Sequence, residues 1–582
     1  MKRMVKRLFA ALMIVSMTSA MQWPQSFTVH AETQAAASEP KLEALEQRMK
    51  EQGALKQGES LDSYEGKIPV IIALGDGSDE GDFSKDILRQ LGGAVEKQKH
   101  FAMRAEARLG HEFCYEGVTY VLGNTLATEL TAAELEALAP MSEILRISPN
   151  FDAIDVGSLE GEEAWQSRPG RRIRRRRALD VHERAAFQPD ELSGRGTVIA
   201  VIDTGFSVSH PDFDMKDTEG AKYPDAKSME ERIAQINSTA GTELLKGKWF
   251  SNKYAYGYNY ANNSREINED GNSHGTHVAG IAASVVRSDA KQAQLIAMRV
   301  LAGESDYSEP AKYARAIEDS LLLGADVINL SFGVPAATLK SVGSELLRAI
   351  AAAKKMGVTI NASAGNESLT DADFMPPTAD QPNYGTISAP ALAGDVIAVA
   401  SIDSETVSLP YLEVEGERIA YYPTTDEAAS SAYGLELPLY TEAGKAKIEE
   451  LAALPEGALR GKAVLIERGE RRFDEKVASV ANLGARLAII YDDQESGDWI
   501  NMGIHDPAIP AVFIRKRDGL LLKGMDGKKI VLHREIAGFK IDSAGDLSYF
   551  SSWGPTPEFD LKPEIAAVGG HVWAAQPGGG FA

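Results

Sequence analysis

The stretch Thr197–Gly205, TVIAVIDTG, decides the fold of this chain. Its first six residues are β-branched or small, and the run then stops at Asp203, followed by Thr and Gly. A short run of this composition is typical of a fully buried strand in a parallel sheet. The sequence therefore predicts a buried strand that carries one carboxylate at its C-terminal end.

Two later segments supply groups that could act together with Asp203. An unpaired buried charge is costly, so the carboxylate needs a partner. The segment Asn272–Gly280, NSHGTHVAG, offers His274, and the segment Ala362–Glu367, ASAGNE, offers Asn366. An Asp, a His and a Gly-Asn turn, in this order, are what a serine hydrolase requires apart from its nucleophile.

With Asp326–Gly333, DVINLSFG, between them, these segments resemble the subtilisin-like serine peptidases (subtilases). The 70 residues between Asp203 and His274 make this stretch longer than in compact subtilisins, and in this the chain resembles the branch of the cell-envelope proteinases and C5a peptidases. The chain order Asp, His, Ser is known from subtilisin, and the resemblance runs from about Gly194 to the end of the chain. It implies an α/β fold, a parallel sheet with helices on both faces. The alternation of strand and helix patterns after His274 predicts the same fold.

The resemblance implies a role for each candidate residue. His274 would be the general base, because an imidazole with a near-neutral pKa can take and return a proton. Asp203 would fix the tautomer of the ring and stabilise the imidazolium. Asn366 would donate its side-chain amide to the oxyanion.

Substrate binding and the nucleophile belong to two further family segments. The segment that would pair with substrate backbone as an added strand holds Ser331, Phe332 and Gly333. The family nucleophile lies in a Gly-Thr-Ser-Met-Ala block that opens a helix, and no Gly-Thr-Ser-Met occurs in this sequence. The chain stops at Gly578–Ala582, GGGFA, where that block would be expected.

Simpler interpretations stay open for each residue. Asp203 could end a strand in a turn, and Asn366 could be a turn residue beside Gly365. His274 and His277 could share a metal, although a zinc site would want a third ligand and no His-Glu-x-x-His motif is present. For the whole chain, the alternatives are a non-catalytic pseudo-protease that binds other molecules, or a gene remnant.

Composition excludes several classes of function. The 582 residues, 44% of them hydrophobic, allow several domains. A formal net charge of −23 argues against nucleic acid as a partner and favours solubility. Protein or peptide substrates are what the resemblance to subtilases implies. The single cysteine, Cys114, excludes a disulfide framework, a Cys-rich zinc site and an iron–sulfur cluster within the chain.

No cofactor is required by the expected chemistry, and a structural calcium ion is left open. The carboxylates of Glu266, Glu269 and Asp270 could bind calcium. An exposed acidic loop explains them as well, because three carboxylates without EF-hand spacing do not specify a calcium site.

The N-terminal residues 1–31 predict a secretory signal. Basic residues between Lys2 and Arg7 precede the apolar run Leu8–Val15, which is too short to span a membrane permanently. We therefore expect a secreted, extracellular protein, and the near absence of cysteine suggests a bacterial source. Cell-wall association is not visible in the sequence. Residues 32–66 predict mainly a polar linker, in which Pro40–Gln57 could form an amphipathic helix with Leu42, Leu45 and Met49 on its apolar face.

Residues 67–150 predict a small α+β domain. Its expected elements are strands at 68–74, 118–122 and 144–149 and helices at 83–91 and 131–138. Its position before the catalytic strand resembles that of the inhibitory propeptide of subtilases, which would make it a partner of the catalytic domain. An unrelated small domain is the alternative.

A basic linker at 151–180 follows, with RRIRRRR at Arg171–Arg177. An exposed basic linker is a good protease substrate, so it predicts cleavage during maturation. A solvated linker that is never cleaved is the alternative.

The catalytic domain is expected in two parts, 181–404 and 539–582. The segment between them, 405–538, carries its own strands and turns and resembles a protease-associated (PA) domain, a β-rich insertion. Insertions of this kind in the family influence substrate access or recognition, and a spacer without a binding role is the alternative.

Overall fold

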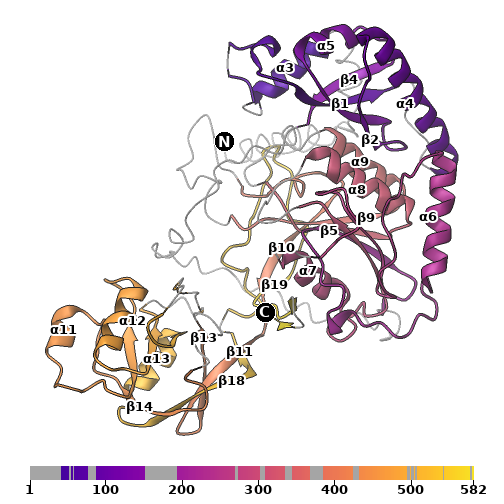
Figure 1. Cartoon of the computed structure of the whole chain (residues 1–582). Coiled ribbons are helices and arrows are strands. Elements are labelled where there is room, and N and C mark those ends of the chain that lie inside the picture. Colours follow the sequence, from indigo (N-terminus) through magenta and orange to yellow (C-terminus); the bar gives the residue numbers. More distant parts are fainter. Residues whose placement is uncertain are drawn as a thin grey trace, which may run out of the picture. The chain divides into compact units, whose positions relative to one another are not determined.

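The computed structural model describes residues 41–581, except for 52–53, 57, 76–86, 151–192, 269–272, 302–308, 335–343, 368–384, 424–430, 494–498, 500–501, 503, 505–506, 542 and 577–579. The chain divides into two compact units (Figure 1). The first comprises Met1–Asp79, Gln98–Gly117 and Thr125–Asn150, and the second comprises Glu80–Lys97, Val118–Asn124 and Phe151–Ala582. The expected signal sequence, the basic run Arg171–Arg177 and the carboxylates of Glu269 and Asp270 lie outside the described residues.

The N-terminal α+β region is built on a four-stranded sheet of order β2-β3-β1-β4, in which β1 pairs antiparallel with β3 and β4. Its elements are α3 (Lys41–Glu51), η1 (Leu61–Ser63), β1 (Ile68–Leu74), α4 (Ile87–Leu109), β2 (Glu116–Thr119), β3 (Thr125–Leu130), α5 (Ala132–Leu138) and β4 (Ile144–Pro149). Helix α5 begins as the sequence predicts, because Thr131 Oγ1 accepts a hydrogen bond from the Glu134 N–H and the Glu134 carboxylate accepts one from the Thr131 N–H.

Three local predictions for this region differ from the structure. The expected strand at 118–122 is shorter and shifted, since β2 ends at Thr119. Of the expected helix at 83–91, residues 83–86 lie outside the described residues, and the rest belongs to the longer α4, which continues to Leu109. The expected linker 32–66 contains α3, whose Leu45 and Met49 are fully buried. Helix α3 packs against β4, so this apolar stripe is explained by a partner that is distant in sequence.

The centre of the second unit is a seven-stranded sheet of order β19-β10-β9-β8-β5-β7-β6, in which every neighbouring pair is parallel. Its strands are β5 (Val198–Asp203), β6 (Tyr254–Asn259), β7 (Gln294–Arg299), β8 (Val327–Leu330), β9 (Thr359–Ser363), β10 (Ile397–Asp403) and β19 (Ile565–Gly570). Strand β5 lies inside the sheet between β7 and β8, which explains its continuous apolar run. This confirms the predicted parallel α/β fold.

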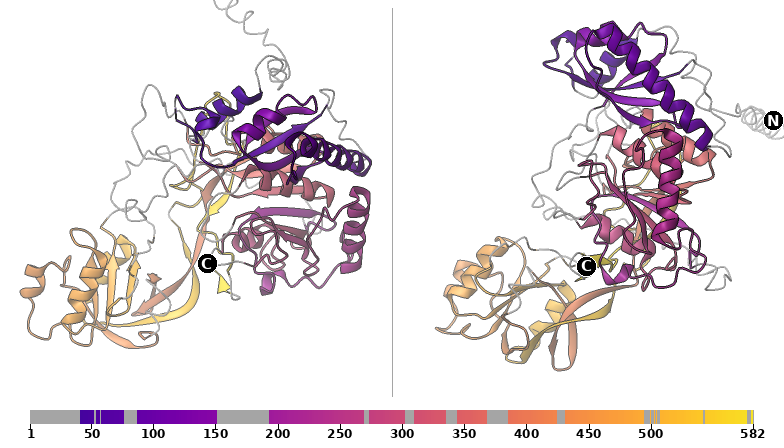
Figure 2. Two further views of the ribbon diagram at one scale, coloured as in Figure 1. Left: turned by 45° about the horizontal axis from the view of Figure 1, so that its top comes forward. Right: turned by 45° about the vertical axis from the view of Figure 1, so that its right-hand side comes forward.

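Helices cover both faces of this sheet. They are α6 (Ala226–Ala240), α7 (His274–Ala283), α8 (Pro310–Leu322) and α9 (Ser344–Lys355), with the short η3 (Pro211–Phe213). Figures 1 and 2 show α8 and α9 side by side on one face, and α7 on the other. Both α7 and α8 contact β5, so the strand that carries Asp203 is enclosed from both sides.

The segment between β10 and β19 has its own eight-stranded sheet, of order β12-β11-β18-β14-β15-β16-β17-β13. Its elements are β11 (Thr406–Val414), β12 (Glu417–Ala420), β13 (Tyr422–Pro423), β14 (Glu436–Tyr440), α11 (Ile448–Ala452), β15 (Ala463–Glu467), α12 (Phe473–Asn482), β16 (Leu487–Tyr491), β17 (Ala511–Ile514), α13 (Lys516–Lys523) and β18 (Lys529–Lys540). Strands β14 to β17 are parallel, with α11 between β14 and β15 in the sequence and α12 between β15 and β16. The described residues of the segment form three apolar core clusters of their own.

This segment enters and leaves through one antiparallel ribbon, which can be followed in Figure 2. Thr406 at the start of β11 pairs with Lys540 at the end of β18. Because the two ends are adjacent, the insertion leaves β10 and β19 free to pair as parallel neighbours, with Val399 opposite Ile565. After β19 the chain adds the short pair β20 (Ala575–Gln576) and β21 (Gly580–Phe581).

Candidate active site

Asp203 and His274 meet at the carboxyl end of the parallel sheet. Asp203 is the last residue of β5 and its side chain is 1% exposed, whereas His274 opens α7 and its side chain is 49% exposed. The Nδ1 atom of His274 lies 2.7 Å from Oδ1 of Asp203. A buried carboxylate on one ring nitrogen of a half-exposed imidazole is the arrangement that prepares a histidine to act as a base.

The backbone around this pair is tightly packed. Oδ1 of Asp203 also accepts a hydrogen bond from the Thr204 N–H at 2.8 Å, and Thr204 Oγ1 accepts one from the Gly275 N–H at 2.9 Å. A Cβ added to Gly275 would lie 2.6 Å from the carbonyl oxygen of Gly205 and 3.2 Å from Asp203 Oδ1. Only glycine allows the first turn of α7 to approach β5 so closely.

Oδ2, the second carboxylate oxygen of Asp203, is buried and has no hydrogen-bond partner among the described residues. The contact with His274 is made by the other oxygen, Oδ1.

The expected substrate segment directly follows β8. Ser331 Oγ accepts a hydrogen bond from Asn329 Nδ2 at 2.8 Å, and the ring of Phe332 stacks on Tyr313, with centroids 4.6 Å apart. Val334 forms an antiparallel bridge with Ala389. The residue after Ser331–Gly333 is therefore already paired, in the manner of a strand, with Ala389.

Asn366 lies in the turn after β9 and is exposed. Strands β9, β8 and β5 are parallel neighbours, so the residues that follow them emerge at one edge of the sheet. Asp203, Ser331–Gly333 and Asn366 therefore lie on the carboxyl edge, where α/β folds bind their ligands.

The metal interpretation of His274 and His277 gains no support. Among the residues described, no group of three His, Cys, Asp or Glu side chains lies close enough to hold a metal ion.

No helix in the described part of the chain is both long and apolar enough to cross a membrane.

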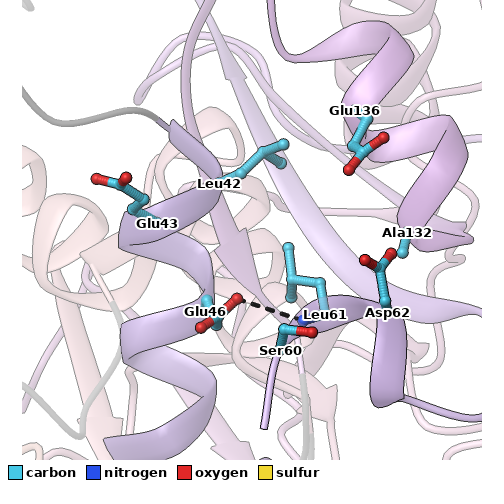
Figure 3. Close-up of a pocket in the computed structure, with 8 residues that line it drawn as sticks. All are labelled: Leu42, Glu43, Glu46, Ser60, Leu61, Asp62, Ala132 and Glu136. Carbon is cyan, nitrogen blue, oxygen red and sulfur yellow. Dashed lines mark hydrogen bonds between the residues drawn. The ribbon is translucent and has the colours of Figure 1, made fainter. Parts of the chain in front are cut away.

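A small pocket of about 140 Å³ lies in the N-terminal region, and it contains none of the expected site residues (Figure 3). Its lining includes the carboxylates of Glu43, Glu46, Asp62 and Glu136. Glu46 accepts hydrogen bonds from the Leu61 N–H and from Lys50, so part of this acidic lining serves local structure.

The sequence did not single out Glu318, a fully buried residue of α8. Within the second unit its carboxylate accepts hydrogen bonds from the backbone N–H groups of Tyr120 and Val121. Burial raises the pKa of Glu318 to about 7, although Arg315 and these hydrogen bonds oppose the shift. Nothing in the local sequence indicates this, because the partners lie about two hundred residues upstream.

A polar cluster around Glu367 was also not predicted. The Glu367 carboxylate accepts hydrogen bonds from the neighbouring Asn366 N–H and from the hydroxyls of Ser388 and Ser552. The last of these is 185 residues away in sequence, so no local pattern could indicate the cluster.

Comparison with known proteins agrees with this geometry. The model of the subtilase family, peptidase S8, matches residues 194–580. The chain belongs to the subtilase family. Subtilases are serine peptidases, so the family predicted from the sequence motifs is confirmed.

This subtilase is similar to bacterial peptidases that are considerably longer. It is 33% identical over 407 residues to a C5a peptidase of Streptococcus pyogenes, a match that covers 67% of this chain and 34% of that protein. It is 25% identical over 427 residues to a PII-type proteinase of Lacticaseibacillus paracasei, covering 68% and 22%. The chain thus spans about a third or less of the length of these relatives.

Among the solved structures that are similar to this chain is that of a psychrophilic subtilisin-like protease from Pseudoalteromonas sp. AS-11. It shares 16% identity with this subtilase and has a TM-score of 0.35, over 61% of this chain and 81% of that one.

Proposed function

We propose that this subtilase is a secreted serine endopeptidase, made as a precursor, that hydrolyses peptide bonds of protein substrates. The observation that carries the proposal is the 2.7 Å contact between His274 Nδ1 and the buried carboxylate of Asp203 at the carboxyl edge of the sheet. The family and its peptidase relatives support the same reaction class.

In this proposal His274 is the general base. With its Nδ1 proton directed at Asp203, the lone pair of Nε2 is available to accept the proton of an attacking hydroxyl. Asp203 then stabilises the imidazolium, which returns the proton to the leaving amine. The buried position of Asp203 keeps this electrostatic interaction strong.

Two further groups would act on the substrate. The side-chain amide of Asn366 would donate to the oxyanion of the tetrahedral intermediate. The loss of such a donor costs about a hundred- to a thousandfold in kcat, a magnitude measured for subtilisin. Ser331, Phe332 and Gly333 would pair with the substrate backbone as an added strand.

The nucleophile in this proposal is a serine from a part of the gene product that the 582 residues do not include. The absence of a Gly-Thr-Ser-Met block from the sequence motivates this point. The greater length of the C5a peptidase relative is consistent with it.

The other regions would control access to the site. We propose that residues 67–150 form the inhibitory propeptide and that residues 405–538 form a PA-like insertion that influences substrate recognition. A structural calcium ion remains an open part of the proposal, and no other cofactor is needed.

A second candidate function is that of a non-catalytic binding protein, which the missing nucleophile motif favours. Casein hydrolysis by the purified full-length gene product separates the two. The peptidase proposal expects hydrolysis that a serine-directed fluorophosphonate abolishes. A folded full-length protein that neither hydrolyses casein nor reacts with the inhibitor would establish the binding function instead.

A further inference from the structure

One carboxylate oxygen beside the oxyanion turn serves as a shared acceptor. Oε2 of Glu367 accepts hydrogen bonds from the Asn366 backbone N–H at 2.9 Å and from the hydroxyls of Ser388 and Ser552, each at 3.1 Å. The Glu367 N–H in turn donates to Ser552 Oγ at 3.0 Å. Three segments that are distant in sequence therefore meet at a single charged atom.

The cluster is closely packed. Ser388 and Ser552 are 2% and 1% exposed, so their hydroxyls have little access to bulk water. Gly365 has φ +116°, and a Cβ there would lie within 2.6 Å of Ser388 Oγ, Glu367 Oε2 and Ser552 Oγ. The backbone before Asn366 is thus held in a conformation that only glycine adopts easily.

Backbone hydrogen bonds add to this arrangement. Ser388 N–H donates to the carbonyl of Ala364, and Ser552 N–H donates to the carbonyl of Gly365. Both residues flank the turn directly before Asn366. The Glu367 carboxylate accepts the Asn366 N–H, so hydrogen bonds hold the backbone of residues 364–366 on which the Asn366 side chain is mounted.

The same cluster reaches the expected substrate segment. A Cβ on Gly333 would lie 2.7 Å from the Cβ of Ser388, and Ala389 exchanges backbone hydrogen bonds with Val334 at 2.9 and 3.0 Å. Ser388 therefore touches the substrate segment on one side and Glu367 on the other. A movement of Glu367 would change the distance between the oxyanion donor and the bound substrate backbone.

We infer that Glu367 is a positioning residue that sets Asn366 relative to the substrate segment Ser331–Gly333. The inference rests on the proposed peptidase function, since it assigns Glu367 an effect on the oxyanion of that reaction. An electrostatic donor contributes to catalysis only when it is held in the right place before the reaction begins. Glu367 would supply this placement through its hydrogen bonds to Asn366, Ser388 and Ser552.

A double-mutant cycle in the full-length gene product tests the inference. The variants are Glu367→Ala, Glu367→Gln, Asn366→Ala and the double variant of Glu367→Ala with Asn366→Ala. Glu230→Gln is the matched control, because Glu230 is exposed on α6 and makes no hydrogen bond or ion pair that the described residues show. Kinetics on a peptide substrate give kcat and KM for each variant.

We expect Glu367→Ala to lower kcat about ten- to a hundredfold and to change KM by less than about twofold, because misplacement forfeits part of the oxyanion contribution. Glu367→Gln keeps one acceptor and should lose less. In the Asn366→Ala background, Glu367→Ala should lower kcat by less than about threefold, because the side chain that Glu367 positions is absent. An equal loss of kcat in both backgrounds, or an effect on KM alone, would overturn the inference.

A second measurement does not depend on activity. In the 582-residue chain, amide hydrogen exchange at Asn366 should be faster in Glu367→Gln than in the wild type, with exchange in β9 unchanged. Unchanged exchange at Asn366 would overturn the inference even if the full-length protein hydrolyses casein. If the wild type is inactive but Asn366 exchanges faster in Glu367→Gln, the peptidase function is refuted and the placement of Asn366 by Glu367 is still supported.

Discussion

At the scale of single residues, the site depends on how closely α7 approaches β5. His274 can reach Asp203 because Gly275 occupies a position where even one additional carbon atom would collide with backbone. The motif His-Gly-Thr-His is therefore a packing requirement as well as a chemical one. Substitutions at this glycine and at Asp203 separate the two requirements.

Gly275→Ala tests the packing requirement. Its added carbon would lie 2.6 Å from the Gly205 carbonyl, so we expect a loss of about 1–3 kcal/mol in the free energy of unfolding. Urea denaturation measures this loss. Gly394→Ala is the matched control, because nothing lies within 4 Å of its added carbon. Equal stability of the two variants would refute the argument from close approach.

Asp203→Asn tests the chemical requirement. The amide has the shape of the carboxylate but loses the charge and favours the wrong tautomer of His274. We expect kcat to fall by a factor on the order of 10⁴ with the fold intact. Kinetics of the full-length protein, with circular dichroism as the check on folding, measure this. A variant that retained more than a tenth of the wild-type kcat would contradict the assigned role of Asp203.

At the scale of elements, the sequence predicted best what is encoded locally. Strand β5 is buried on both faces, so its apolar run is continuous, and Asp203, His274 and Asn366 each sit in a contiguous motif. The sequence allowed an amphipathic helix where α3 lies but favoured a linker, because the apolar stripe has no partner nearby in the sequence and packs against the distant β4. The contacts of Glu318 and Glu367 escaped prediction for the same reason, since their partners are far away in sequence.

The burial of Glu318 within α8 predicts a pH dependence of stability. Its pKa in the folded chain, about 7, lies above the ordinary value of 4.5, so the folded state holds this proton more tightly than the unfolded state. The stabilisation is complete below pH 4.5 and is lost as the pH rises through 7. The free energy of unfolding should fall by roughly 3 kcal/mol over this range.

Urea denaturation of the wild type and of Glu318→Gln at several pH values measures this effect. The neutral amide cannot titrate, so the variant should lose less stability than the wild type between pH 4 and pH 8. The other buried charges nearby, Arg315 and Asp319, are common to both proteins. Parallel curves of stability against pH would show that Glu318 keeps an ordinary pKa.

At the scale of the whole molecule, the insertion between β10 and β19 is organised as a separate folding unit. It has its own sheet and three core clusters, and its ends pair with each other at Thr406 and Lys540. A fragment that spans residues 404–541 should therefore fold alone, with one cooperative thermal transition. A fragment without a cooperative transition would show that the insertion needs the parallel sheet in order to fold.

The central claim is that Asp203 and His274 activate a serine that attacks peptide bonds. The most direct test is to label the purified full-length gene product with a fluorophosphonate and to locate the adduct by mass spectrometry. We predict an adduct on a single serine outside the 582 residues, with labelling lost in His274→Ala and retained in Glu230→Gln. A folded wild-type protein that is not labelled, or labelling that does not depend on His274, would contradict the claim.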